Sequence, residues 1–246
     1  MLRRALAALL LAVLLAACGG GEGGEAREGA TARLWVTHDR GAEVVLTATV
    51  PAGLTVMQAI QREAEVETRY GGRFVEAIEG VKGSLDEQRD WFYFLNGIEP
   101  DVGAAEVRLD EGDVAWWDYR SWSEQMAQPV VVGAFPEPFV HGWGDQRRPV
   151  VVSAPPSLAV QAQALQRLLG TGGSGEPNSF VLQVLKGAQG ATLTATRGEA
   201  NDAPVTFRLA GSLPAVRAAA EALVARPASV RFRYEARFDE RGNVLG

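Results

Sequence analysis

The sequence predicts an α+β protein built from two small units. Aromatic and β-branched residues, which favour strands, gather in residues 91–122, where four of the six tryptophans lie. Several strands and one helix are predicted around this stretch, whereas the second half of the chain mixes strands with two helices. With 246 residues, the chain is long enough to bury two separate cores.

The first elements form a predicted β-hairpin. Apolar and β-branched residues dominate residues 34–38 and 44–50, on either side of the turn Asp39-Arg40-Gly41, and alternate side chains would face opposite sides of each strand. A helix is expected next, because Thr55 is a favourable N-cap and is followed by apolar residues at helical spacing. After this helix, residues 74–81 are predicted to form a third strand.

The aromatic stretch predicts two further strands, at residues 91–97 and 112–122, joined by a polar loop. Side chains on a strand point alternately to opposite faces. On the second of these strands one face is uncharged and is predicted to face the core: Ala115, Trp117, Tyr119 and Ser121. Trp116 shares the other face with Asp118 and Arg120, so we expect that it is not fully buried.

The second half begins with a short predicted strand at residues 130–132 and a loop rich in aromatics and prolines. A strand at residues 150–152 and a helix at residues 158–169 are predicted next. Three strands follow, at residues 180–185, 191–196 and 205–209. The chain then has a predicted helix at residues 212–225 and a last strand at residues 230–238. This order favours a small α/β sandwich of the split βαβ, ferredoxin-like kind.

The pattern Trp91-x-Tyr93-x-Leu95-Asn96-Gly97, then Gly112-Asp113 and Trp117-x-Tyr119, resembles the C-terminal domain of transcobalamin and intrinsic factor. Residues 53–60 and 71–81 fit the same family, so that the resemblance covers about residues 31–123. It implies a β-grasp-like N-terminal domain. In the vertebrate members this domain caps a corrinoid that a separate helical barrel mainly holds. Bacterial secreted proteins and lipoproteins, mostly of unknown function, carry relatives of it.

The N-terminus has the features of an export signal. Arg3 and Arg4 precede an apolar run that is too short and wrongly flanked for a membrane span. Leu15-Ala16-Ala17-Cys18 resembles a bacterial lipobox, which implies that Cys18 is lipidated. The alternative is an ordinary signal peptide with an incidental cysteine. We expect an extracytoplasmic protein that is lipid-anchored to a bacterial cell membrane.

The expected domains follow from these features. Residues 1–18 are the signal peptide, and residues 19–30, rich in Gly and Glu, form a flexible tether of roughly 20 Å. Residues 31–127 form the β-grasp-like domain, and residues 128–246 form the second α/β sandwich.

Charge differs between the two halves of the chain. Residues 19–128 carry 10 basic and 21 acidic residues, whereas residues 129–246 carry 12 basic and 9 acidic ones. Arg231, Arg233 and Arg237 share one face of the last predicted strand, which either contacts the acidic first half or is simply solvated. No basic surface with interleaved aromatics indicates nucleic-acid binding.

Residues suited to catalysis are scarce. The sequence has two histidines, His38 and His141, and its single cysteine excludes a disulfide framework and a cysteine metal cluster. Asp110, Glu111 and Asp113 lie close together, but their spacing is not that of a calcium loop, and a polar turn explains them. We therefore predict no catalytic residue, no metal site, no cofactor and no enzymatic function.

A ligand-binding site between the two units is expected instead. Its predicted residues are Trp116, Asp118, Arg120, Phe135, Phe139, His141 and Trp143. The aromatic rings would stack on a planar small molecule, corrinoid-like by resemblance, and the charged groups would supply polar contacts. The resemblance also suggests a membrane uptake system as a partner.

Two other interpretations remain open at this point. The aromatics can merely seal the contact between the two units, or the protein can be an envelope scaffold that binds another protein. A concave pocket near Trp116 or Trp143 would favour ligand binding, whereas a flat, exposed apolar patch would favour the scaffold.

Overall fold

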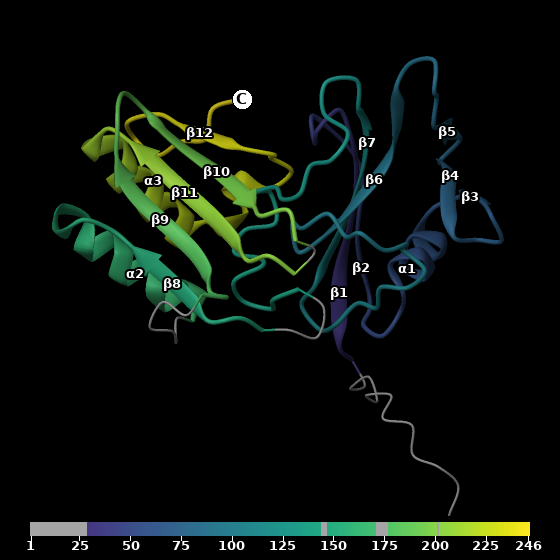
Figure 1. The fold of residues 1–246 in the computed structure, drawn as a ribbon, viewed down its shortest axis with the longest axis horizontal. Helices are drawn as coiled ribbons and strands as arrows, with labels where there is room; N and C mark the ends of the chain where they lie inside the picture. The colour runs from purple at the N-terminus through teal and green to yellow at the C-terminus, as the bar shows by residue number, and fades with distance from the viewer. Residues whose placement is uncertain (1–28, 144–146, 171–176, 201) are drawn as a thin grey trace, which may run out of the picture.

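The computed structural model describes residues 29–143, 147–170, 177–200 and 202–246. Cys18, the signal segment and most of the expected tether lie outside these ranges. The described chain is a mixed α+β structure with several sheets and few helices (Figure 1). None of its helices is long and apolar enough to span a membrane.

The first sheet has the strand order β2-β1-β7-β6. Its strands are β1 (Thr31–His38), β2 (Glu43–Pro51), β6 (Arg89–Leu95) and β7 (Val114–Ser121). β1 and β7 are parallel neighbours at the centre, and each pairs with its outer neighbour in antiparallel register. The predicted hairpin and the two aromatic strands are therefore present.

Helix α1 (Val56–Glu63) covers one face of this sheet. The Thr55 hydroxyl accepts a hydrogen bond from the Gln58 amide at 3.1 Å, and the Gln58 side chain accepts one from the Thr55 amide at 2.8 Å. This reciprocal capping box fixes the start of the helix at the predicted position. Under the helix lies the predicted core face of β7, where Ala115, Trp117 and Tyr119 are buried.

A small antiparallel sheet lies beside β6. It consists of β3 (Val66–Arg69), β4 (Phe74–Ile78) and β5 (Val81–Lys82). The single strand predicted over residues 74–81 is interrupted, because Glu79 and Gly80 adopt positive φ angles and make a tight turn.

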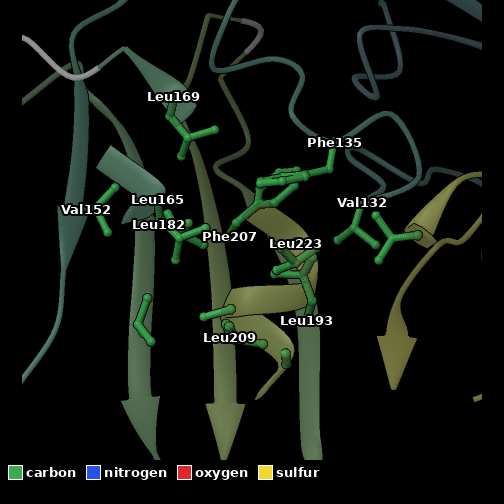
Figure 2. Close-up of a cluster of buried hydrophobic side chains, with 14 of the residues drawn as sticks. Val132, Phe135, Val152, Leu165, Leu169, Leu182, Leu193, Phe207, Leu209 and Leu223 are labelled. Atoms are coloured by element: carbon green, nitrogen blue, oxygen red, sulfur yellow. The ribbon is translucent and has the colours of Figure 1, made fainter. Parts of the chain in front are cut away.

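The second sheet has the order β12-β10-β11-β9-β8. Its strands are β8 (Val150–Ser153), β9 (Phe180–Lys186), β10 (Ala191–Arg197), β11 (Val205–Gly211) and β12 (Ala236–Phe238). Helices α2 (Ala159–Leu169) and α3 (Leu213–Ala225) pack together against it (Figure 1). Leu165 and Leu169 of α2 and Leu223 of α3 share a core with the sheet residues Leu182, Phe207 and Leu209 (Figure 2).

This strand order corrects the ferredoxin-like prediction. In a split βαβ unit another strand separates the two strands that a helix connects. Here β8 and β9, which α2 connects, are adjacent and parallel. The elements and the α/β sandwich match the prediction, but periodicity along the chain carries no information about which strands become neighbours.

The strand predicted over residues 230–238 is much shorter. A 3₁₀ helix (Pro227–Val230) comes first, Phe232 adopts a φ of 63°, and only β12 pairs with the sheet. Arg231 and Arg233 therefore do not share a strand face with Arg237. The strand predicted at residues 130–132 is likewise reduced to a single bridge, between Ile98 and Val130.

A third apolar cluster joins the two sheets. Trp35, Phe94, Val114 and Trp116 project from the face of the first sheet opposite α1, and Val131, Ala134 and Tyr234 pack on them. Both faces of β7 are consequently covered, and every residue of this strand from Val114 to Arg120 is buried.

Candidate functional site

The Asp118 carboxylate is the polar centre of this contact between the sheets. Its Oδ1 accepts hydrogen bonds from the Thr37 hydroxyl at 2.6 Å and the Gly41 amide at 3.2 Å. Its Oδ2 accepts from the Tyr234 hydroxyl at 2.7 Å and the Arg40 amide at 3.1 Å. Burial raises the pKa of Asp118, and these donors oppose that effect. The four donors allow a fully buried carboxylate to be accommodated.

The turn between β1 and β2 is shaped around this carboxylate. Asp39, Arg40 and Gly41 have φ angles of 52°, 59° and 82°, so three consecutive residues are left-handed. A side chain at Gly41 would place its Cβ 1.9 Å from the Phe232 carbonyl oxygen, so only glycine fits there. Asp118 thus holds a strained turn that carries Arg40 toward the second sheet.

An open groove of about 890 Å³ lies beside this turn, between the two sheets. Its walls are the turn, the segment that follows β7, part of β10 and the residues before β12. The lining residues are Asp39, Arg40, Ser121, Ser123, Glu124, Gln125, Gln128, Thr194, Ala195, Tyr234 and Glu235. Hydroxyl, amide and charged side chains predominate among them, so the groove suits a polar ligand.

Arg40 and Tyr234 form the ordered end of the groove. The Arg40 guanidinium lies 4.2 Å from the centroid of the Tyr234 ring, and its Nη2 donates to Gln128 Oε1 at 3.2 Å. Burial and the neighbouring Asp118 raise the pKa of the Tyr234 hydroxyl, which therefore stays protonated and donates to Asp118. Asp39, on the same turn, forms an ion pair with Arg89.

Arg120, a predicted ligand contact, supports the groove from beneath. Its fully buried guanidinium lies 3.7 Å from the centroid of the Phe92 ring. The guanidinium donates to the carbonyl oxygens of Gln125 at 3.0 Å and Met126 at 2.7 Å. Arg120 therefore fixes the segment that forms one wall, without lining the groove itself.

Trp116 is fully buried, which corrects the expectation that its charged neighbours would leave it partly exposed. Its indole Nε1 donates to the Thr37 hydroxyl at 2.7 Å, and that hydroxyl donates in turn to Asp118. Its ring packs edge-on against Tyr234, at 5.6 Å between centroids. The C-terminal segment that carries Tyr234 covers this face of the strand, so that no ligand can stack on Trp116.

The loop aromatics do not converge on Trp116 either. Phe135 and Phe139 are buried in the core of the second sheet, where Figure 2 shows Phe135 in the same cluster as Phe207. The ring of Phe139 packs edge-on against that of Phe207, with 4.9 Å between their centroids. Trp143 is partly buried against the cores of both sheets, with the Arg197 guanidinium 5.3 Å from its ring. Phe135 and Phe139 therefore pack within the second sheet's own core, and of these three loop aromatics only Trp143 packs against both cores.

None of the seven predicted residues lines the groove. Two of them, Asp118 and Arg120, position its walls, and Trp116 lies behind Thr37. The sequence pattern identifies Asp39-Arg40-Gly41 only as a turn and Tyr234 only as a strand residue. The signal that could have singled out the turn is Asp-Arg at positions where hairpins usually place Asn or Gly.

A second buried polar cluster begins at Asp113. Its Oδ1 accepts from Asn96 Nδ2 and its Oδ2 from the Asp110 amide, each at 2.7 Å. The same Asn96 nitrogen donates to the Gly142 carbonyl at 2.9 Å. Burial raises the pKa of Asp113 to about 6. These contacts fix the turn before β7 and tie it to the aromatic loop, which fits the turn predicted from the acidic residues.

Glu137 and His141 complete this cluster. The Glu137 side chain is 1% exposed and accepts from the His141 amide at 2.9 Å, while its other oxygen lies 2.7 Å from His141 Nδ1. This hydrogen bond raises the pKa of His141. Across the described ranges, no group of three or more His, Cys, Asp or Glu residues is arranged to hold a metal ion. The predicted site residue His141 is thus half of a structural pair.

One comparison with known proteins matches a defined part of the chain. A family model described as a domain of unknown function, DUF4430, matches residues 53–121, within the stretch that resembles the transcobalamin C-terminal domain. No curated protein matched the chain.

Two solved structures show distant similarity. One is a Ruminococcus gnavus protein with a provisional description as metal-binding, at 14% identity and a TM-score of 0.31 over 37% of this chain and 97% of that one. The other is haptocorrin in complex with Cbi, at 16% identity and a TM-score of 0.30 over 37% of this chain and 25% of that one.

Proposed function

We propose that this chain is a lipid-anchored, extracytoplasmic binding protein whose small-molecule ligand occupies the groove beside Arg40 and Tyr234. The observation that carries the proposal is the groove itself, whose volume of about 890 Å³ lies within the usual range of small-molecule sites. The proposal includes no catalytic step. It also interprets the two sheets as two domains, β-grasp-like over residues 31–127 and an α/β sandwich over residues 128–246, with the ligand between them.

The support beneath the groove favours a binding role. Asp118 accepts hydrogen bonds from the turn of the first sheet and from Tyr234 of the C-terminal segment. One carboxylate therefore positions two of the walls of the groove. Arg120 positions the third wall through two main-chain carbonyls. Rigid support of this kind lowers the entropic cost of binding, because the groups that meet the ligand are already ordered.

The lining indicates a polar ligand of little net charge. Ser121, Ser123 and Thr194 offer hydroxyls, whereas Gln125 and Gln128 offer amides. Three carboxylate side chains stand against the single guanidinium of Arg40: Asp39, Glu124 and Glu235. Asp39 and Glu235 are themselves paired with Arg89 and Arg237, so the groove carries little net charge and favours a neutral polar ligand. A corrinoid, as the sequence resemblance implies, would have only the Tyr234 ring to stack on, and it serves as one probe among several.

Delivery to a membrane uptake system is the cellular role that fits this proposal. The charged start, the apolar run and the sequence Leu15-Ala16-Ala17-Cys18 support an exported protein that is acylated at Cys18. A binding protein held at the membrane would pass its ligand to a transporter there, as the resemblance to bacterial lipoproteins suggests.

The direct test is calorimetry on the full chain in mild detergent. The probes are a neutral disaccharide, a polyamine, a dipeptide, cobinamide and, as an anion, inorganic phosphate. We expect saturable binding of a neutral polar probe, the disaccharide or the dipeptide, and none of phosphate or the polyamine. Because a ligand that binds only the folded state stabilises it, the same probe should raise the melting temperature.

Two threonines on β10 supply a matched pair of variants. Thr194 lines the groove, whereas Thr192, two residues earlier on the same strand, does not. Thr194→Tyr should fill the groove and weaken binding at least about tenfold, the equivalent of about 1.4 kcal/mol, while Thr192→Tyr should leave it unchanged. Equal affinity of the two variants, or no saturable binding of any probe, would refute the groove as the ligand site.

A specific observation also favours a second function, that of a protein-interaction module. Tyr70 and Phe74, at the turn between β3 and β4, are 80% and 46% exposed, and their rings pair at 6.5 Å between centroids. Exposed aromatics of this kind mark interaction surfaces. If Tyr70→Ala abolishes capture of an envelope protein by a chain that binds none of the probes, the scaffold interpretation replaces ours.

A further inference from the structure

Strand β2 is a long sheet edge with no strand of the described ranges on its outer side. It has nine residues, lies at the end of the first sheet and pairs only with β1. Between Glu43 and Pro51 it carries seven uncharged residues in a row, and Val44 and Val45 are 48% and 38% exposed. Such an edge offers unpaired main-chain N–H and C=O groups to any other strand.

The other sheet edges in the described ranges are protected. The outer edge of β6 is covered through the Ser84–Arg89 bridge and by the Trp91 indole, which donates to the Val81 carbonyl at 2.8 Å. β12 has three residues, with the exposed Arg237 in the middle, and β8 has four. β3 has four residues and carries Glu67 and Arg69. Short strands, edge charges and bulges are the usual protection against pairing. β2 has a bulge at Val45, near its first residue, and from Leu46 to Pro51 it is regular and uncharged.

We propose that β2 pairs with β2 of a second copy of this chain. The two strands would run antiparallel about a two-fold axis at Thr47, so that the two four-stranded sheets become one continuous sheet. The facing pairs are Val44 with Val50, Val45 with Thr49, Leu46 with Ala48, and Thr47 with Thr47. The only charged residue of the strand, Glu43, faces Pro51, and no like charges meet.

The side chains on both faces of β2 would be buried by pairing with a second copy, which favours this partner over a foreign peptide. Leu46 and Ala48 point toward α1 and are only partly buried against the first core. In the proposed register they face each other across the axis and extend that core. Val45, Thr47 and Thr49 are exposed on the opposite face, where β-branched side chains form favourable cross-strand pairs. A charged peptide would find no countercharge between Glu43 and Pro51.

Thr47→Cys in the full chain tests the register. Facing Cα atoms of an antiparallel pair are about 4.5–5.5 Å apart, a distance at which a disulfide forms. We expect a disulfide-linked dimer on a non-reducing gel after mild oxidation, and its loss on reduction. The controls are the wild type, whose single cysteine is Cys18, and Thr68→Cys on the charged edge strand β3.

A mixture of Val45→Cys and Thr49→Cys chains should cross-link better than either variant alone, because these two positions face each other only between copies. Equal cross-linking of Thr47→Cys and Thr68→Cys would overturn the proposal, since random collision would then explain both. Preferential cross-linking of Val45→Cys with itself would overturn the proposed register.

A charge exchange separates pairing from misfolding. Thr47→Lys and Thr47→Glu should each sediment as monomers and melt like the wild type, whereas a mixture of the two should restore the dimer. A wild type that stays monomeric at every concentration would refute the proposal. A monomeric wild type that instead binds an extended peptide through this edge would assign it to a foreign partner.

Discussion

Asp118 shows how a buried residue can shape a groove without lining it. It lies on a strand between Trp116 and Arg120, and its charge suggests a wet face. In the folded chain it is the acceptor for four donors from three separate segments. It therefore positions Arg40 and Tyr234 at the end of the groove.

Replacing this carboxylate should loosen that end. Asp118→Asn keeps the shape of the side chain but replaces one accepting oxygen with an N–H₂ group. The two donors that faced this oxygen then lose their acceptor, so we expect a loss of about 1–3 kcal/mol in the free energy of unfolding. Tyr234→Phe removes a single donor and should cost less. Urea denaturation measures both, and an unchanged midpoint for Asp118→Asn would contradict the role assigned to this group.

The Asp113 and His141 cluster predicts a dependence of stability on pH. Burial raises the pKa of Asp113 from 3.8 to about 6, so its contribution is full below pH 3.8 and is lost as the pH rises through about 6. The raised pKa of His141 acts in the same direction, above its ordinary value of 6.5. Melting curves between pH 4 and pH 8 should therefore show that the melting temperature of Asp113→Asn falls less than that of the wild type as the pH rises through about 6. An identical pH profile for the variant would exclude this contribution.

At the scale of elements, β7 organises the molecule because both of its faces are buried. Trp117 packs under α1 in the first core, at 5.1 Å from Tyr93 between ring centroids. Trp116 packs on the other face with Trp35, Phe94 and Tyr234. One strand therefore joins the core of its own sheet to the contact with the second sheet.

Truncation on either face should destabilise the fold. Trp117→Ala and Trp116→Ala should each lower the free energy of unfolding by about 3–5 kcal/mol, because each removes a large buried ring. The exposed Leu85, 82% accessible, supplies a control, and Leu85→Ala should change stability little. Chemical denaturation distinguishes these cases. A Trp116→Ala protein that melts like the wild type but binds a probe more weakly would restore the ligand-contact interpretation.

At the scale of the whole molecule, the two sheets enclose an apolar contact on one side of Asp118 and a polar groove on the other. The Trp116 cluster excludes water from the contact, and the groove opens where the turn, the segment after β7 and β10 diverge. A ligand in the groove would touch both sheets and stabilise their arrangement. The proposed pairing through β2 uses an edge that none of the groove residues occupies.

Anchoring is the remaining prediction at this scale. If Cys18 is acylated, the wild type should partition into the detergent phase and Cys18→Ser should remain in the aqueous phase. Stable membrane attachment needs two or more acyl chains, because one chain binds only marginally. Phase separation followed by immunoblotting measures the partition, and an equal distribution of the two proteins would refute the anchor.

Sequence alone determined the elements whose signals are local. Thr55 and Gln58 form the predicted cap of α1, the Asp39-Arg40-Gly41 turn forms the predicted hairpin, and the uncharged face of β7 lies in the core. Each of these depends on residues within a few positions of one another, so spacing and propensity are sufficient to find them.

Only the tertiary structure decided the strand order of the second sheet and the role of the charged face of β7. Whether a carboxylate can be buried depends on its partners, and two of the donors to Asp118 are distant in sequence. The hydrogen bond from Thr37 to Asp118 spans 81 positions, and the one from Tyr234 spans 116. No pattern around Trp116 could indicate that these donors would arrive, satisfy the charge and cover the ring.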